Sequence, residues 1–396
     1  MSNDSESPVN ERPCKSDDAA GSSVLLRLER IDCPLCGSPD SSVVQTSRDN
    51  LCGIPGEFAI ERCGKCGHRF MNPRPVLECL GDCYPYQYGP HQIATATTQP
   101  AVAKDQRTSG PDVSGAAERP LYLQILPLRY VPGLRRFYNW LMDDRSQPVP
   151  VASMPGRRAG RPEQGISGDS NKPRALELGC ATGQYLLRLQ NAGWNASGIE
   201  PGQRPAAMAK DAGLDVHCGT LETCELLPES FDLAAAWMVI EHVPDPRNTL
   251  RTLHQFLKPG GTLLFSIPNV GCWEPKVFGR YWYVWELPRH LHHFTTKSIR
   301  TLLEQCKFTD IKIVHQRNLS NVIGSLALTL LARWPDSRVG RWLLRYPDRP
   351  TFMLKLFLAP MAHVLAWLGQ GGRLTISARR PPQPAPARSE AARMQP

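Results

Sequence analysis

The sequence predicts an α/β fold built on a mostly parallel β-sheet. The first indication is the segment 175–184, which has the pattern of a buried strand, a glycine turn and the start of a helix. A second apolar stretch ends at Glu200, and others lie at 214–219, 230–240 and 257–269. Because strands that alternate with helices usually pair in parallel, these segments predict one sheet whose strands end at a common edge.

The turn after the first strand indicates what this edge binds. Its glycines are Gly179 and Gly183, and Glu177 stands two residues before the first of them. A dinucleotide site normally has a G-x-G-x-x-G turn, which lets a helix N-terminus approach a pyrophosphate. A carboxylate at Glu177 would repel a pyrophosphate, but it suits a cationic ligand such as the amino group of S-adenosylmethionine.

The motifs of residues 174–316 resemble those of the class I S-adenosylmethionine-dependent methyltransferases. The glycine turn is similar to the family's E/D-x-G-x-G-x-G motif, and it departs from that motif at Ala181, a small residue in place of glycine. The segments 230–246 and 257–269 are similar to the family's fourth and fifth strands with their adjoining loops. The resemblance implies a Rossmann-like, seven-stranded methyltransferase sheet with S-adenosylmethionine as the cofactor.

The resemblance also implies which residues contact the cofactor. Glu200 matches the acid that holds the ribose hydroxyls, and Thr220 and Leu221 lie where the family flanks the adenine. The residues implied at the cofactor are Glu177, Gly179, Ala181, Gly183, Glu200, Thr220, Leu221, Trp237 and Met238.

The first candidate for the catalytic base is His242. It lies in the segment 241–246, which resembles the family's "EHVPDP" loop, and that loop opens toward the methyl group of the cofactor. Histidine is suited to removing a proton near neutral pH, and the neighbouring Glu241 is expected to orient its ring. The alternative is that His242 only caps the following helix.

A second histidine cluster lies in the segment 288–295, which resembles the family's "P.H..HF" segment. His290 and His293 are three residues apart, so they share a face if this turn is helical. These histidines also suggest a metal site, but no suitably spaced carboxylate accompanies them. Some similar ubiquinone O-methyltransferases bind a divalent ion with an acid where this chain has Met238, so their metal dependence is not carried over.

Four of the thirteen cysteines form two C-x-x-C-G pairs, Cys33 with Cys36 and Cys63 with Cys66. Two such turns complete a tetrahedral site, so we expect a structural zinc ribbon whose zinc has no open position. The redox alternative requires a thioredoxin-like context, which the sequence lacks. The following segment, with Tyr84, resembles the opening of bacterial small-molecule and sugar-pathway methyltransferases, and its role stays open.

The composition and patterning divide the chain into seven segments. These are a disordered N-terminus (1–28), the zinc ribbon (29–88), a linker with one helix at 133–143 (89–172), the methyltransferase core (173–320), an apolar helical insertion (321–371), the last core strand (372–379) and a disordered tail (380–396).

The insertion 321–371 combines two strongly apolar stretches with arginines. The strands on either side of it belong to one sheet, so a single membrane crossing is impossible. One interpretation is a helical pair that lies in the membrane interface with its arginines at the headgroups. The alternatives are helices buried against the sheet, a substrate lid or a dimer contact. The N-terminus has no signal-like segment, so we expect a cytoplasmic protein, with this interpretation placing it peripherally on the inner membrane face.

We therefore expect methyl transfer from S-adenosylmethionine to a small-molecule or lipid-linked acceptor, as O- or C-methylation. A zinc-ribbon rRNA methyltransferase is the first alternative, which the net charge of +9 permits. No N-P-P-Y or D-P-P-Y motif supports it, so a nucleic-acid partner is not expected. The second alternative is a non-catalytic cofactor-binding scaffold. The acceptor's identity and the oligomeric state stay open.

Overall fold

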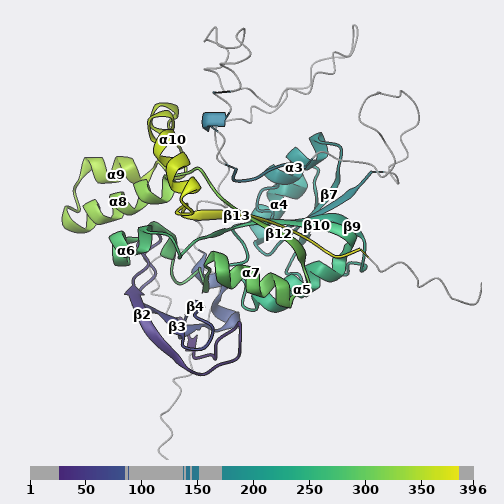
Figure 1. Cartoon of the computed structure of the whole chain (residues 1–396), viewed down its shortest axis with the longest axis horizontal. Helices are drawn as coiled ribbons and strands as arrows, with labels where there is room; N and C mark the ends of the chain where they lie inside the picture. Colours follow the sequence, from purple (N-terminus) through teal and green to yellow (C-terminus); the bar gives the residue numbers. More distant parts are fainter. Residues whose placement is uncertain are drawn as a thin grey trace, which may run out of the picture.

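The computed structural model describes residues 26–84, 88, 137, 140–142, 145–150 and 172–382. Its largest part is a seven-stranded sheet with the order β12-β13-β10-β9-β6-β7-β8 (Figure 1). The strands are β6 (Arg174–Leu178), β7 (Asn195–Glu200), β8 (Asp215–Cys218), β9 (Phe231–Trp237), β10 (Leu257–Pro268), β12 (Thr309–His315) and β13 (Arg373–Arg379). The pairs from β8 to β10 are parallel, whereas β13 is antiparallel to β10 and β12. The predicted fold class is confirmed.

The central strands are buried on both faces, as expected of a parallel sheet that helices cover. Strand β9 is buried at every position except Asp232, which is half-buried. The covering helices are α3 (Gln184–Asn191), α4 (Gln203–Asp211), α5 (Pro246–Phe256) and α7 (Thr296–Gln305). α5 starts where the Asp245 side chain accepts hydrogen bonds from the amides of Arg247 and Asn248, with proline at the first helical position.

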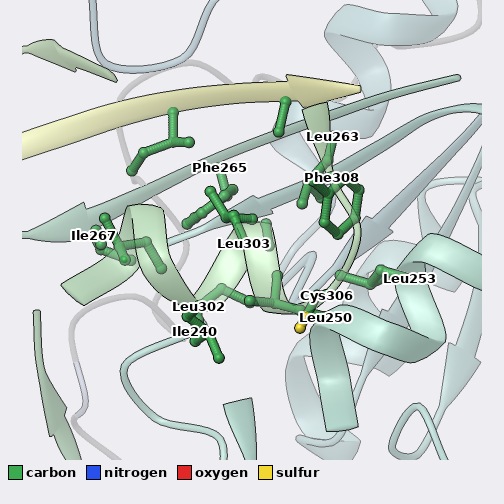
Figure 2. Close-up of a cluster of buried hydrophobic side chains, with 14 of the residues drawn as sticks. Ile240, Leu250, Leu253, Leu263, Phe265, Ile267, Leu302, Leu303, Cys306 and Phe308 are labelled. Atoms are coloured by element: carbon green, nitrogen blue, oxygen red, sulfur yellow. The ribbon is translucent and has the colours of Figure 1, made fainter. Parts of the chain in front are cut away.

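The core lies between the sheet and these helices. Figure 2 shows one cluster, in which Leu250 and Leu253 of α5 and Leu302 and Leu303 of α7 meet the side chains of β10. The residues that β10 contributes are alternate positions on one face of the strand: Leu263, Phe265 and Ile267. Packing on this face of β10 fixes the positions of α5 and α7. It therefore also fixes where each preceding loop ends, at the first residue of the helix.

The cysteine-rich segment forms a second, four-stranded sheet with the order β11-β4-β3-β2. Its strands are β2 (Ser41–Ser47), β3 (Phe58–Cys63), β4 (Arg69–Met71) and β11 (His292–His293), and a separate pair joins β1 (Leu28–Glu29) to β5 (Arg74–Pro75). Strand β11 comes from the large domain and pairs antiparallel with β4. The condition for His290 and His293 to share a helical face is therefore not met, because His293 is extended and paired into this sheet.

A buried ion pair also joins the ribbon to the large domain. The two terminal nitrogens of Arg289 donate to the two carboxylate oxygens of Asp49 at 3.0 and 2.9 Å, and both side chains are 0% exposed. Although burial alone would raise it, these hydrogen bonds hold the pKa of Asp49 below its ordinary value. The same guanidinium donates to the Cys83 carbonyl, which fixes the end of the ribbon segment.

Three helices lie between β12 and β13: α8 (Ser320–Arg333), α9 (Arg338–Leu344) and α10 (Phe352–Trp367). Figure 1 shows them grouped beside the start of β13. They share a small core around Ile323, Ala327, Leu343 and Tyr346. Within the described ranges, no helix combines the length and apolar character needed to cross a bilayer.

Several predicted boundaries shift in the structure. Leu28 belongs to β1, and the Arg380 amide donates to the Gly261 carbonyl, so neither lies in a loose terminus. Within the expected linker, the Pro148 carbonyl accepts from the Tyr185 hydroxyl at 2.8 Å, which ties this stretch to α3. Of the expected helix at 133–143, residues 137 and 140–142 are described and helical. The other residues of 133–143 and most of the linker lie outside the described residues, as do residues 1–25 and 383–396 of the termini that were predicted to be disordered over 1–28 and 380–396.

Candidate active site

The turn between β6 and α3 requires glycine at two positions. Gly179 and Gly183 have φ angles of +69° and +81°, which favour glycine. A Cβ atom on Gly183 would lie 2.1 Å from Leu214 Cδ1, and one on Gly179 would lie 2.5 Å from Val239 Cγ2. The chain therefore folds back tightly here, and Ala181 between the glycines also has a positive φ of 46°.

Glu200 ends strand β7 beside this turn. One carboxylate oxygen accepts from the Ala181 amide at 2.9 Å, and the other accepts from the Gly202 amide at 2.8 Å. The side chain is 3% exposed, and burial raises its pKa despite these two amides. The turn and the strand end are thus one rigid unit, at the position where the sequence resemblance places the acid that holds a ribose.

Glu177 is the second acid of this unit. It is 3% exposed, and its Oε2 atom has no hydrogen-bond partner among the described residues. Burial and the nearby charge of Glu200 raise the pKa of Glu177 to about 8. A buried carboxyl group with one unpartnered oxygen, next to a second acid, is suited to a cation, because a bound positive charge would compensate for the lost hydration. The ammonium group of S-adenosylmethionine fits this requirement.

The other residues expected at the cofactor lie at the same edge of the sheet. Leu221 is buried after β8, whereas Thr220 is exposed and its amide donates to the Thr223 hydroxyl at 2.9 Å. Trp237 ends β9 with its ring edge-on to Tyr185 at 5.0 Å, and Met238 follows with a positive φ of 56°. The carboxyl ends of β6 to β9 therefore gather all these positions along one edge.

His242 lies in the turn that follows β9. Its Nδ1 atom is 3.0 Å from the Tyr84 hydroxyl and 3.2 Å from the Arg289 carbonyl oxygen. A carbonyl oxygen can only accept a hydrogen bond, so this contact favours the tautomer with the proton on Nδ1. In that tautomer Nε2 is the basic nitrogen of the ring.

His290 packs against His242, with the two rings edge to face at 4.5 Å. Its Nδ1 atom lies 2.9 Å from the Val284 carbonyl, and its Nε2 atom lies 3.3 Å from Glu286 and 4.0 Å from Glu241. Burial lowers the pKa of His290. The sequence had suggested that no carboxylate accompanies these histidines, and this is wrong, because folding brings two acids to His290.

Glu241 is fully buried, and neither of its carboxylate oxygens has a hydrogen-bond partner among the described residues. Burial raises its pKa to about 8, so at neutral pH this carboxyl group is mostly protonated beside His290. His293 packs edge to face on His290, with ring centroids 6.4 Å apart. Its ring also packs edge to face on Trp285 at 5.0 Å, within strand β11.

The ribbon segment supplies two tyrosines to the histidines' surroundings. The Tyr84 hydroxyl meets His242, and the Tyr88 hydroxyl donates to Glu286 at 2.7 Å. The two rings pack edge to face at 5.2 Å. The sequence showed the tyrosines as part of a motif but gave no sign of their role, because their partners lie far along the chain.

Part of the chain matches a family of known proteins. A family model described as a methyltransferase domain matches residues 156–313. The chain carries a methyltransferase domain. The methyltransferase domain is similar to the ubiquinone biosynthesis O-methyltransferases of Pseudomonas entomophila (strain L48) and Pseudomonas syringae pv. tomato. Each is 31% identical over 133 residues, which are 31% of this chain and 56% of the relative. The chain thus spans just over half the length of these relatives.

Among solved structures, the chain is similar to an S-adenosylmethionine-dependent methyltransferase from Thermotoga maritima. The two are 21% identical with a TM-score of 0.36, and the match covers 52% of this chain and 82% of the other.

The cysteines of the ribbon that adjoins the methyltransferase domain lie close enough to share one metal ion. The Sγ atoms of Cys33 and Cys66 are 3.5 Å apart, as are those of Cys36 and Cys63, and all four lie within 4.8 Å of one another. Four thiolates around a tetrahedral zinc, with Zn–S bonds of about 2.3 Å, are separated by about 3.8 Å. The Cys66 amide also points at Cys63 Sγ, at 3.4 Å. This donor set fits zinc.

Proposed function

We propose that the protein transfers a methyl group from S-adenosylmethionine to an oxygen or carbon atom of a small-molecule or lipid-linked acceptor. The observation that carries this proposal is the position of His242, whose loop follows β9 at the same sheet edge as the turn of Gly179 and Gly183. A proton acceptor and a cofactor turn at one edge match the needs of methyl transfer. The names of the ubiquinone O-methyltransferases similar to this chain support a small-molecule acceptor.

We assign the cofactor contacts along this edge. Glu200 holds the ribose hydroxyls and Glu177 pairs with the ammonium group, while Gly179, Ala181 and Gly183 let the backbone approach the ligand. Thr220 and Leu221 flank the adenine, and Trp237 and Met238 border the ligand at the end of β9. When bound, S-adenosylmethionine supplies a methyl group on a cationic sulfur that is open to in-line displacement.

The remaining residues prepare the acceptor. His242 Nε2 removes the acceptor's proton, and Tyr84 and the Arg289 carbonyl hold the ring by its other nitrogen. His290 packs against the ring of His242. Glu241 supports the loop of His242 through its backbone carbonyl, which accepts hydrogen bonds from the amides of Leu291 and His292. His293 is assigned to the ribbon interface. We propose a structural zinc on Cys33, Cys36, Cys63 and Cys66.

The decisive test uses the purified protein and S-adenosylmethionine with a labelled methyl group. Both are incubated with a bacterial extract, which is then separated into organic-soluble, small aqueous, RNA and protein fractions. We expect label in the organic or small aqueous fraction. Label in RNA would favour an rRNA methyltransferase instead, and cofactor binding without any labelled product would favour a non-catalytic scaffold.

Replacing His242 by alanine is expected to lower kcat by about 10²–10⁴-fold, the usual contribution of a positioned general base. Cofactor affinity, measured by isothermal titration calorimetry, should stay unchanged, because the cofactor contacts come from other residues. His254→Gln is the matched control, since this histidine packs on Phe308 at the far end of α5. A His242→Ala protein with full activity would contradict the assignment of the base.

Cofactor binding is expected to release a proton from Glu177. Because its pKa is about 8, this carboxyl group is mostly protonated at pH 7, and a bound cation favours its charged form. Affinity should therefore rise from about pH 6 to about pH 8. Calorimetry in buffers of different ionisation enthalpy measures the released proton. Glu177→Gln should bind more weakly and release none, and an unchanged release would refute the pairing.

A further inference from the structure

Helix α10 is far more apolar than its burial requires. It has one charged residue, Lys355, among sixteen, and only Ala359 and Ala362 are buried. Phe357 and Trp367 are 80% and 84% exposed. A helix that is apolar on all sides normally lies inside a protein core or in contact with lipid. Among the described residues, most of the surface of α10 therefore lacks the cover that its composition predicts.

The uncovered side chains form a continuous stripe along α10. They follow one another by three or four residues, which places them on one face of the helix. The stripe consists of Met353, Phe357, Met361, Val364 and Trp367, each at least 48% exposed. Trp334, Val339 and Trp342 add exposed apolar side chains from the end of α8 and from α9. None of these exposed side chains belongs to the small core that the three helices share.

Positive charge accompanies this stripe in the same insertion. The insertion 321–371 contains six basic and two acidic residues. The arginines are all exposed: Arg333, Arg338, Arg341, Arg345 and Arg349. Exposed apolar and aromatic side chains next to arginines are typical of helices that lie in the interface of an anionic membrane.

We infer that α8, α9 and α10 form a peripheral membrane-docking surface for anionic bilayers. The apolar stripe of α10 enters the boundary between headgroups and acyl chains, and the arginines contact the anionic headgroups. None of the described helices is long and apolar enough to cross a bilayer, and a single crossing is also impossible because β12 and β13 are neighbours in one sheet. This inference does not depend on catalysis, and it goes beyond the proposed methyl transfer.

A second copy of the chain fits this surface less well. In a symmetric dimer the same patch faces itself, so the arginines of both copies would be brought together. The two acidic residues of the insertion, Asp336 and Asp348, cannot neutralise the six basic ones. An anionic lipid surface satisfies both the apolar stripe and the charge.

The docking surface is hydrogen-bonded to the segment 283–290, which carries His290 of the candidate active site. The Tyr283 amide donates to Ser325 Oγ of α8 at 2.8 Å, and the next residue's carbonyl accepts from His290. Docking of α8 would therefore hold the segment 283–290, and with it His290, near the bilayer. If the proposed function holds, this favours a lipid-linked acceptor over a freely diffusing one.

The test is flotation of the full-length protein with vesicles of phosphatidylcholine alone or mixed with phosphatidylglycerol. We expect binding to the mixed vesicles and much weaker binding to phosphatidylcholine alone. The double variant Phe357→Asp/Trp367→Asp should lose at least about tenfold in binding, because two exposed apolar contacts are removed. Arg341→Ala and Arg345→Ala should each cost about fivefold. Unchanged binding of all these variants would overturn the inference.

The matched controls are Leu227→Asp and Val277→Asp, which alter side chains that are 75% and 65% exposed outside the insertion. They should bind vesicles like the original protein, and an equal loss would overturn the inference. Light scattering without lipid measures the oligomeric state and tests the alternative that the stripe binds a second copy of the chain. If the original protein were a dimer and Phe357→Asp/Trp367→Asp a monomer, the stripe would be assigned to that second copy. Cofactor affinity is measured on the same samples, so a failure of methyl transfer and a failure of docking are distinguished.

Discussion

Replacing Asp49 by alanine is expected to destabilise the protein by about 3–5 kcal/mol, as is usual when a buried ion pair loses one partner. Arg289 would keep its positive charge in a site where the side chain is 0% exposed. Urea unfolding followed by circular dichroism measures the loss. The exposed pair of Arg280 and Glu57 provides the control, and Glu57→Ala should cost about 0–1 kcal/mol.

The same variant separates stability from catalysis. Arg289 also presents the carbonyl that contacts His242, so a displaced Arg289 should lower kcat more than cofactor affinity. The double variant Asp49→Leu/Arg289→Met removes both charges and should recover part of the lost stability. If it were no more stable than Asp49→Ala, the buried charge would not be the cause of the destabilisation.

The parts of the molecule that rest on local sequence signals were predictable. The glycine turn depends on Gly179 and Gly183, whose positive φ angles and close neighbours leave no room for a side chain. The helix Thr296–Gln305 begins directly after Thr295, because Thr295 and Ser298 cap each other's backbone amides. The fold class followed from such signals, since each lies within one strand, turn or helix.

The contacts between distant segments were not predictable. Nothing near His292 indicates that it pairs with Phe70, and nothing near Asp49 indicates a buried Arg289. Periodicity reports which face of an element is apolar, but it does not report which other segment covers that face. The glycine pair of the segment 257–269 shows a related limit. β10 runs through Gly260 and Gly261, with Gly260 at a φ of +81° and a shift in the register of β10 to β9.

Removing the metal from the four cysteines should have a still larger effect. Binding of a structural zinc contributes about 10–16 kcal/mol to the folded state of small zinc domains. In the Cys63→Ser/Cys66→Ser variant we therefore expect the ribbon to unfold and zinc content, measured by mass spectrometry, to fall from about one ion per chain to none. Cys218→Ser is the control, because Cys218 is exposed and lies outside the cluster.

The consequence for catalysis follows from what the ribbon holds in place. Its strand β4 pairs with β11, and Tyr84 contacts His242, so an unfolded ribbon leaves the histidine loop without these partners. Methyl transfer should fall by about 10²–10⁴-fold, like the loss of the base itself. Cofactor binding should persist, because Gly179, Gly183 and Glu200 belong to the large sheet and its turn. A zinc-free variant that kept its activity would show that the ribbon is not required to position His242.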